Sequence, residues 1–219
     1  MHKSLVGFAM TKEVRVGVIG ATALLCLSVA MAVEPPPGGF YPEENTALGK
    51  DALFNYVVGG IGQNVAIGYN AMFSDTAGAS NTAVGDGALF SNADGGANVA
   101  LGFWALHDNT SGSRNVAVGE FALVNNTTAD NNTAVGDAAM QGNTTGFYNA
   151  ALGSGAMNFN TTGNLNTALG AKALAFNNSG SQNTAIGYAA LNLLSSGQMR
   201  LSADAIKTLR ELSVPTNAA

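Results

Sequence analysis

Residues that could carry catalysis are few in this chain, and they stand apart from one another. The 219 residues include two histidines and one cysteine, and His107 is the only histidine beyond the first few positions. Serine and threonine are common, but no histidine and aspartate accompany them as a catalytic triad requires. Acidic residues of the central region occur singly, which predicts no calcium site. Gly59-Gly60-Ile61-Gly62 lacks the lysine and the following helix of a phosphate-binding loop. We therefore expect a non-enzymatic protein that uses no cofactor and no metal.

Large aromatic residues suggest a different chemistry, which is contact with a ligand. They gather in the first half of the chain, at positions that vary between the sequence repeats described next. The predicted contact patch consists of Tyr69, Phe73, Phe90, Phe103, Trp104 and Phe121. Exposed rings of this kind can mark a binding surface. Alternatively, the rings fill a groove between subunits or the core of the first coils.

A repeat of 17 residues must position these side chains. Nine copies begin at Asn45, Asn64, Asn81, Asn98, Asn115, Asn132, Asn149, Asn166 and Asn183, and only the first interval is longer, at 19 residues. A short, fixed period is the signature of a solenoid, in which each copy forms one coil and stacks on the previous one. The predicted fold is therefore all-β, a parallel β-solenoid (β-roll) of nine 17-residue coils with a short C-terminal capping helix.

Numbering each repeat from its first asparagine gives every position a role. Positions 1 to 5 read Asn, Thr/Val/Ala, Ala, an aliphatic residue and Gly, which predicts a short strand that enters a turn. Alternation along a strand puts positions 2 and 4 on one face and positions 1 and 3 on the other. We expect position 4 to face the interior. The alanines of position 3 then face neighbouring subunits, or they fit a tight bend within the chain. The predicted interface residues are Ala47, Ala66, Ala83, Ala100, Ala117, Ala134, Ala151, Ala168 and Ala185.

The second half of the repeat is less regular. Positions 6 to 11 contain an Ala-Leu or Ala-Met pair that should close the core, in either a second short strand or one helical turn. Position 12 is asparagine in most copies, from Asn92 to Asn177. Side-chain amides stacked one coil apart can bond to each other along the axis. Both asparagine columns are therefore predicted to be structural.

The two ends of the chain have a different composition. Residues 1–32 combine early basic residues, an apolar run and an Ala-Met-Ala exit, which predicts a secretory signal peptide, with a membrane anchor as the alternative and Met1 or Met10 as the start. Residues 33–44 form a Pro/Gly-rich arm, residues 45–199 the solenoid, and residues 200–219 an amphipathic helix and tail. That helix would cover the last coil, or begin a coiled coil.

Charge narrows the range of partners. Nine Lys and Arg residues stand against 14 Asp and Glu residues, for a net charge of −5. An acidic chain without basic clusters is not expected to bind nucleic acid.

The repeat also resembles a known family. Asn81-Thr82-Ala83-Val84-Gly85 with Ala88-Leu89, and the matching stretch from Asn183 to Leu191, are similar to the head repeats of YadA-like trimeric autotransporter adhesins. The resemblance implies a left-handed parallel β-roll, a homotrimer and exposure on a bacterial surface, where it binds host matrix or other cells. The coiled-coil stalk and membrane anchor of that family find no match here, so a separate outer-membrane anchor is a possible partner.

Three functions follow from this sequence. The leading one is a secreted or cell-surface, adhesin-like head with a host-matrix or cell-surface ligand. The second is a self-assembling extracellular filament or matrix subunit, and the third is an ice-binding solenoid, because several threonines share position 2.

Overall fold

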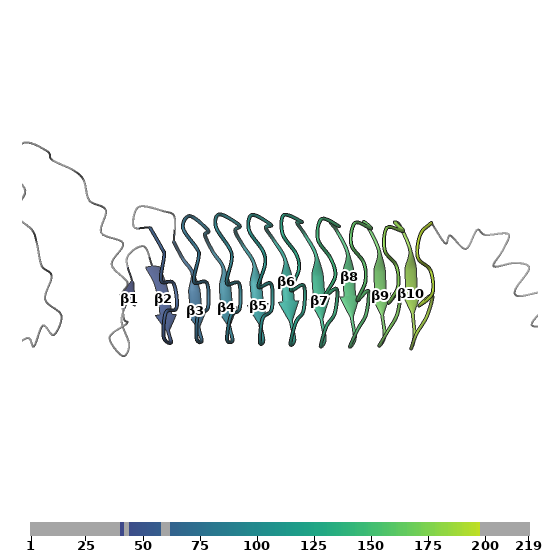
Figure 1. Cartoon of the computed structure of the whole chain (residues 1–219), viewed down its shortest axis with the longest axis horizontal. Helices are drawn as coiled ribbons and strands as arrows, with labels where there is room; N and C mark the ends of the chain where they lie inside the picture. The colour runs from purple at the N-terminus through teal and green to yellow at the C-terminus, as the bar shows by residue number, and fades with distance from the viewer. Residues whose placement is uncertain (1–39, 42–43, 58–61, 198–219) are drawn as a thin grey trace, which may run out of the picture.

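A computed structural model describes residues 40–41, 44–57 and 62–197, and Figure 1 shows them as a row of stacked coils. The predicted leader and C-terminal helix, with most of the arm, lie outside the described residues. The strands are β1 (Phe40–Tyr41), β2 (Asn45–Leu48), β3 (Val65–Ile67), β4 (Thr82–Val84), β5 (Val99–Leu101), β6 (Val116–Val118), β7 (Thr133–Val135), β8 (Ala150–Leu152), β9 (Thr167–Leu169) and β10 (Thr184–Ile186).

The strands form one sheet in sequence order, and each coil contributes one rung. β2 to β10 pair in parallel, and each residue lies opposite the same repeat position in the next coil, as in Ala83 opposite Ala100. The prediction of an all-β parallel solenoid with 17-residue coils is confirmed. β1 adds an antiparallel pair to β2, with Phe40 opposite Thr46, and so covers the edge at which the sheet would otherwise begin.

The second half of each coil is neither of the two predicted structures. Its backbone bonds to the next coil, as when Leu89 N–H donates to Ala105 C=O at 3.0 Å, but no strand or helix forms there among the described residues. The reason lies in the backbone angles. Positions 7 and 9 adopt left-handed conformations, with φ of 54° at Trp104 and 52° at Leu106. Alternation between left-handed and ordinary residues produces neither an extended strand nor a helical turn.

The core is narrow and consists of three columns. The alanines of positions 3 and 8 and the Leu or Met of position 9 are buried in every coil from the second to the eighth, as for Ala83, Ala88 and Leu89. Position 9 therefore supplies the one large apolar side chain that each coil contributes to the core. Around this side chain, positions 3 and 8 have room only for the methyl group of alanine.

This core reverses two predictions made from the strand. Position 4 does not face the interior, because Leu152 and Ile186 are 49% and 68% exposed. Position 3 does not line a subunit interface, because its alanines are buried inside the chain's own core, where no second chain can reach them. The alanines concerned are Ala47, Ala66, Ala83, Ala100, Ala117, Ala134, Ala151, Ala168 and Ala185.

The glycine of position 5 allows the coils to approach one another. Gly85 has a φ of 141°, and a Cβ built on it would lie 2.3 Å from the carbonyl oxygen of Gly102 in the next coil. Any side chain at this position would separate neighbouring coils, which explains why glycine occurs here in every copy.

Candidate binding surfaces

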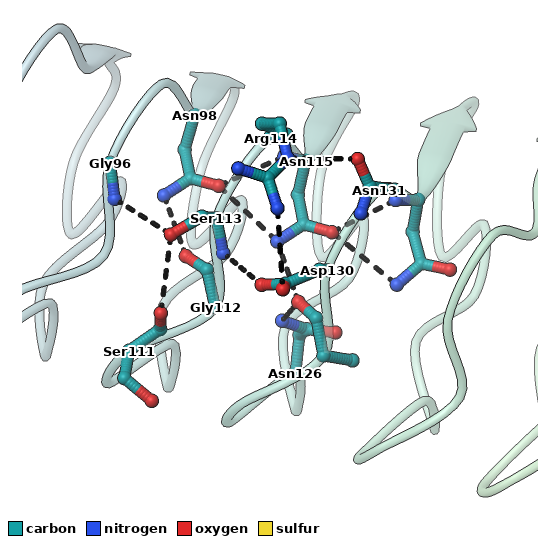
Figure 2. A network of polar contacts seen from close by, with 12 residues as sticks. Gly96, Asn98, Ser111, Gly112, Ser113, Arg114, Asn115, Asn126, Asp130 and Asn131 are labelled. Atoms are coloured by element: carbon teal, nitrogen blue, oxygen red, sulfur yellow. Dashed lines mark hydrogen bonds and ion pairs between the residues drawn. The ribbon is translucent and has the colours of Figure 1, made fainter.

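The two asparagine columns are internal ladders and are not available to a ligand. Figure 2 shows Asn115, whose backbone N–H donates to Asn98 Oδ1 at 2.9 Å and whose Nδ2 donates to Ala129 C=O at 2.8 Å. In the second ladder, Asn109 Nδ2 donates to Asn92 Oδ1 at 2.8 Å and to Gly112 C=O at 2.9 Å. All these asparagines are buried, so the predicted structural role of both columns is confirmed.

An aspartate replaces asparagine in the second ladder. Asp75 is fully buried, and its Oδ1 accepts a hydrogen bond from Asn92 Nδ2 at 2.7 Å. Burial raises the pKa of Asp75 to about 7, although the hydrogen bonds from Asn92 and from the Gly78 backbone oppose the rise; the nearby Asp94 adds to it. This carboxyl group is therefore partly protonated near neutral pH. Sequence analysis missed it, although its place in an asparagine column was visible.

No group of three or more His, Cys, Asp or Glu side chains in the described part of the chain is arranged to hold a metal ion. Within the same ranges, no helix is both long enough and apolar enough to span a bilayer.

The outward face of the sheet is an uncharged stripe. It consists of positions 2 and 4, and position 2 carries only Thr, Val or Ala. We call this surface the aliphatic face, after the residues of position 4. These are Leu48, Ile67, Val84, Leu101, Val118, Val135, Leu152, Leu169 and Ile186, all half-buried or exposed. A sheet with one face in water normally places polar side chains on that face. The aliphatic face therefore has the composition of a surface that another surface covers.

A continuous aromatic cluster forms on a different part of the coils. Phe73 and Phe90 stack almost parallel, with ring centroids 5.2 Å apart, and Phe90 stacks on His107 at 4.9 Å. Trp104 continues the cluster from His107, with centroids 4.4 Å apart. Phe54 extends it at the other end, 5.1 Å from Phe73.

The structure brings together five of the six predicted contact residues. Phe103 stacks on Trp104 at 5.5 Å, and the edge of Phe121 meets both rings. Tyr69 makes no ring–ring contact with the cluster, and Lys50 Nζ lies 5.7 Å from its ring centre. Sequence analysis missed Phe54 and His107, although both share position 10 with Phe73 and Phe90.

The cluster lies outside the hydrophobic core, so its rings do not fill the first coils as the alternative interpretation proposed. Phe103 and Trp104 are 41% and 39% exposed. Gly87 makes room for the indole, because a Cβ at Gly87 would lie 2.8 Å from Trp104 Cδ1. The cluster is thus a supported, partly exposed aromatic surface.

Comparison with known proteins adds no relative: no family model, curated protein or solved structure matches this chain.

Proposed function

We propose that this chain is a non-enzymatic, adhesin-like head that acts as a homotrimer, secreted or held at a bacterial cell surface. The observation that carries the proposal is the aliphatic face. It runs along the whole described solenoid without a charged residue, and its position 4 side chains remain exposed at Leu152 and Ile186. Large contiguous apolar surfaces of this kind mark protein interfaces.

Self-association explains the face better than a foreign partner does. An aliphatic residue occupies position 4 in all nine coils, and the parallel strands space these residues evenly along the axis. The aliphatic face of one copy can therefore pack against the same face of another copy, coil by coil. Closed cyclic assemblies place identical surfaces around an axis. The resemblance of the repeats to YadA-like heads favours three chains, with the aliphatic faces turned toward the axis.

The aromatic cluster is the candidate contact surface for a host-matrix or cell-surface ligand. Its rings belong to positions 6, 7 and 10, whereas the aliphatic face belongs to positions 2 and 4. A trimer built on the aliphatic face can therefore leave the exposed sides of Phe103 and Trp104 open to a ligand. A separate outer-membrane protein would serve as anchor.

A second candidate is a filament or matrix subunit. The regular parallel pairing favours it, because neighbouring coils from β2 to β10 all pair in the same register. End-to-end stacking of two solenoids would continue this pairing beyond β10. An ice-binding role ranks lower, because aliphatic residues at position 4 lie beside the threonines of position 2 on the same face.

Light scattering on the purified protein separates these functions. A single species with the mass of three chains is expected for the adhesin-like head. Growth without a fixed mass would instead favour the filament, and a monomer with thermal hysteresis would favour ice binding. Either result would overturn the proposed trimeric head.

A further inference from the structure

A shallow cavity lies on the side of the solenoid, across the fourth, fifth and sixth coils. Its volume is about 240 Å³, and its lining includes Arg114, Thr128, Asp130, Asn131, Phe147 and Tyr148. None of these residues belongs to the hydrophobic core, to the aliphatic face or to the aromatic cluster. The cavity is formed by the variable positions 14, 16 and 17, which the invariant coil backbone holds in place.

One wall of the cavity is an oriented guanidinium group. Arg114 Nε donates to Asn131 Oδ1 at 3.0 Å, and Arg114 Nη2 lies 3.6 Å from Asp130 Oδ2. Figure 2 shows that Asp130 is itself fixed, because its Oδ1 accepts the Ser113 backbone N–H at 2.7 Å. Arg114 Nη1 makes no hydrogen bond to any described residue, and the Arg114 side chain is 61% exposed. The group is therefore held in place while part of its donor capacity remains for a ligand.

The opposite wall is aromatic. Phe147 and Tyr148 are both exposed, and their rings meet edge to face with centroids 5.8 Å apart. Arg114, Asn131 and Tyr148 occupy position 17 of three successive coils. Two rungs of about 4.8 Å place the backbone at Arg114 and Tyr148 roughly 10 Å apart along the axis. The cavity is large enough to hold a single sugar ring in contact with both groups of side chains.

We propose that this cavity binds an acidic sugar, a uronic-acid unit that carries one carboxylate and several hydroxyl groups. Arginine binds carboxylates through paired hydrogen bonds. Asp130 and Asn131 offer acceptors to sugar hydroxyl groups, and the Phe147 and Tyr148 rings offer apolar surface to the C–H face of the sugar.

The carboxylate of Asp130 decides between ligand classes. A sulfate ion or a run of acidic peptide side chains would bring several negative charges and no hydroxyl donors to Asp130, and like charges repel. A uronic acid brings one negative charge for Arg114 together with hydroxyl groups that can donate to Asp130. The mixed charge of the cavity therefore favours the sugar over an acidic peptide.

This inference does not depend on the proposed trimer. The cavity is complete within one chain and takes no residue from the aliphatic face. Light scattering on the same samples reports the oligomeric state separately, so failure of one proposal is distinguishable from failure of the other.

Calorimetric titration of the full chain with a trisaccharide that holds one galacturonic-acid unit between two galactose units tests the proposal. Neutral galactotriose and a triglutamate peptide serve as comparison ligands. We expect the uronate to bind with a roughly millimolar or lower Kd. Arg114→Gln should weaken it about ten-fold or more, since a hydrogen bond to a charged group is lost. Tyr148→Ala should also weaken binding. Lys172→Gln is the matched control, because Lys172 is a cation outside the cavity, and it should leave the Kd unchanged.

The proposal is overturned if the wild-type chain does not bind the uronate, or if galactotriose or triglutamate binds equally well. Equal binding by wild type and Arg114→Gln would also overturn it. A thermal melt of each variant reports folding. If Arg114→Gln does not fold, Arg114→Lys replaces it; this variant keeps the charge without the paired donors, and its binding should be weaker than wild type.

Discussion

Single buried polar groups define how the coils of this protein stack. In the second ladder, Asn109 donates both to the amide oxygen of Asn92 in the preceding coil and to the backbone carbonyl of Gly112 in its own coil. Asp75 occupies one position of the second ladder, and its ionised carboxylate can accept hydrogen bonds but cannot donate them. Its neighbours Asn64 and Asn92 donate to it, and the Gly78 backbone N–H does so too.

Asp75→Asn should stabilise the protein at high pH. The pKa of Asp75 rises from 3.8 to about 7 on folding, so between these values the folded state binds more protons than the unfolded state. Stability from this group is therefore greatest below pH 3.8 and falls as the pH rises toward 7. The total change is on the order of a few kcal/mol at about 1.4 kcal/mol per pH unit.

Urea unfolding at pH 5 and pH 8 measures the effect of Asp75→Asn. The variant should gain most over wild type at pH 8. Asp137→Asn is the control, because Asp137 is exposed and lies four coils away from Asp75. Equal gains for Asp75→Asn at both pH values would contradict the proposed cause.

Gly87→Ala should displace Trp104. The added methyl group would lie 2.8 Å from the indole, whereas a methyl group at Gly155 would meet only Lys172 Cγ, at 3.8 Å. The two glycines have almost the same φ, +61° and +62°, so the backbone cost of alanine is the same and Gly155→Ala is a matched control. Overpacking should cost Gly87→Ala roughly 1–3 kcal/mol more than the control.

Fluorescence reports this displacement directly, because Trp104 is the only tryptophan in the chain. We expect the emission of Gly87→Ala to shift to longer wavelength as the indole moves into water, with no shift for Gly155→Ala. Identical spectra for the two variants would mean that Gly87 does not support the indole.

At the scale of the single coil, we expect the asparagine ladders to be a major source of stability. Asn109→Ala would leave Asn92 Oδ1 without its donor. It would also remove one of two hydrogen bonds at the Gly112 carbonyl, which keeps Asn98, and one of two at Asn126 Nδ2, which keeps Ala129. The buried oxygen without a donor costs about 1–3 kcal/mol, and each further hydrogen bond lost costs about 1 kcal/mol, so the free energy of unfolding should fall by about 2 kcal/mol or more. Asn125→Ala, at an exposed position one residue before the ladder, should change it by less than about 0.5 kcal/mol. Chemical denaturation compares the two variants, and a similar loss in both would exclude the ladder as a major source of stability.

The period and residue types of the sequence were sufficient to predict the coil, its strand and its asparagine ladders, but not which face of the strand is internal. Alternation separates Ala83 from Val84 without showing which of them points inward. The larger apolar residue was predicted to be internal, yet apolar residues also occupy interfaces and surfaces. The large side chain that fills the core is instead Leu89, in the second half of the coil. The left-handed backbone could not be predicted from residue type, because position 7 includes Trp104, Ala138 and Lys172, and position 9 is always Leu or Met, none of which favours that conformation.

The candidate sites were predictable to different degrees. Five rings of the aromatic cluster came from residue type alone, since large aromatics in neighbouring coils meet whenever their positions match. The cavity beside Arg114 depends on three variable positions that come together only when the height and orientation of each coil are known. Sequence spacing does not supply that orientation.

At the scale of the whole molecule, the solenoid separates its surfaces by repeat position. The aliphatic face lies on the outer side of the strands, and the aromatic cluster follows the turn after each strand. The cavity precedes the strand, at positions 14 to 17. One rigid backbone can therefore assemble with other copies along one surface and bind ligands on the others.

The mass of Val118→Glu in solution tests this account most directly. Val118 lies on the aliphatic face and makes no part of the core, whereas Ser111 is exposed elsewhere and provides the control Ser111→Glu. Sedimentation equilibrium should show three chains for wild type and for Ser111→Glu. Val118→Glu should be a single chain with an unchanged far-ultraviolet circular dichroism spectrum, because three carboxylates would meet at the trimer axis. A wild-type monomer, or a Val118→Glu variant that remains trimeric, would contradict the assignment of the aliphatic face to self-association.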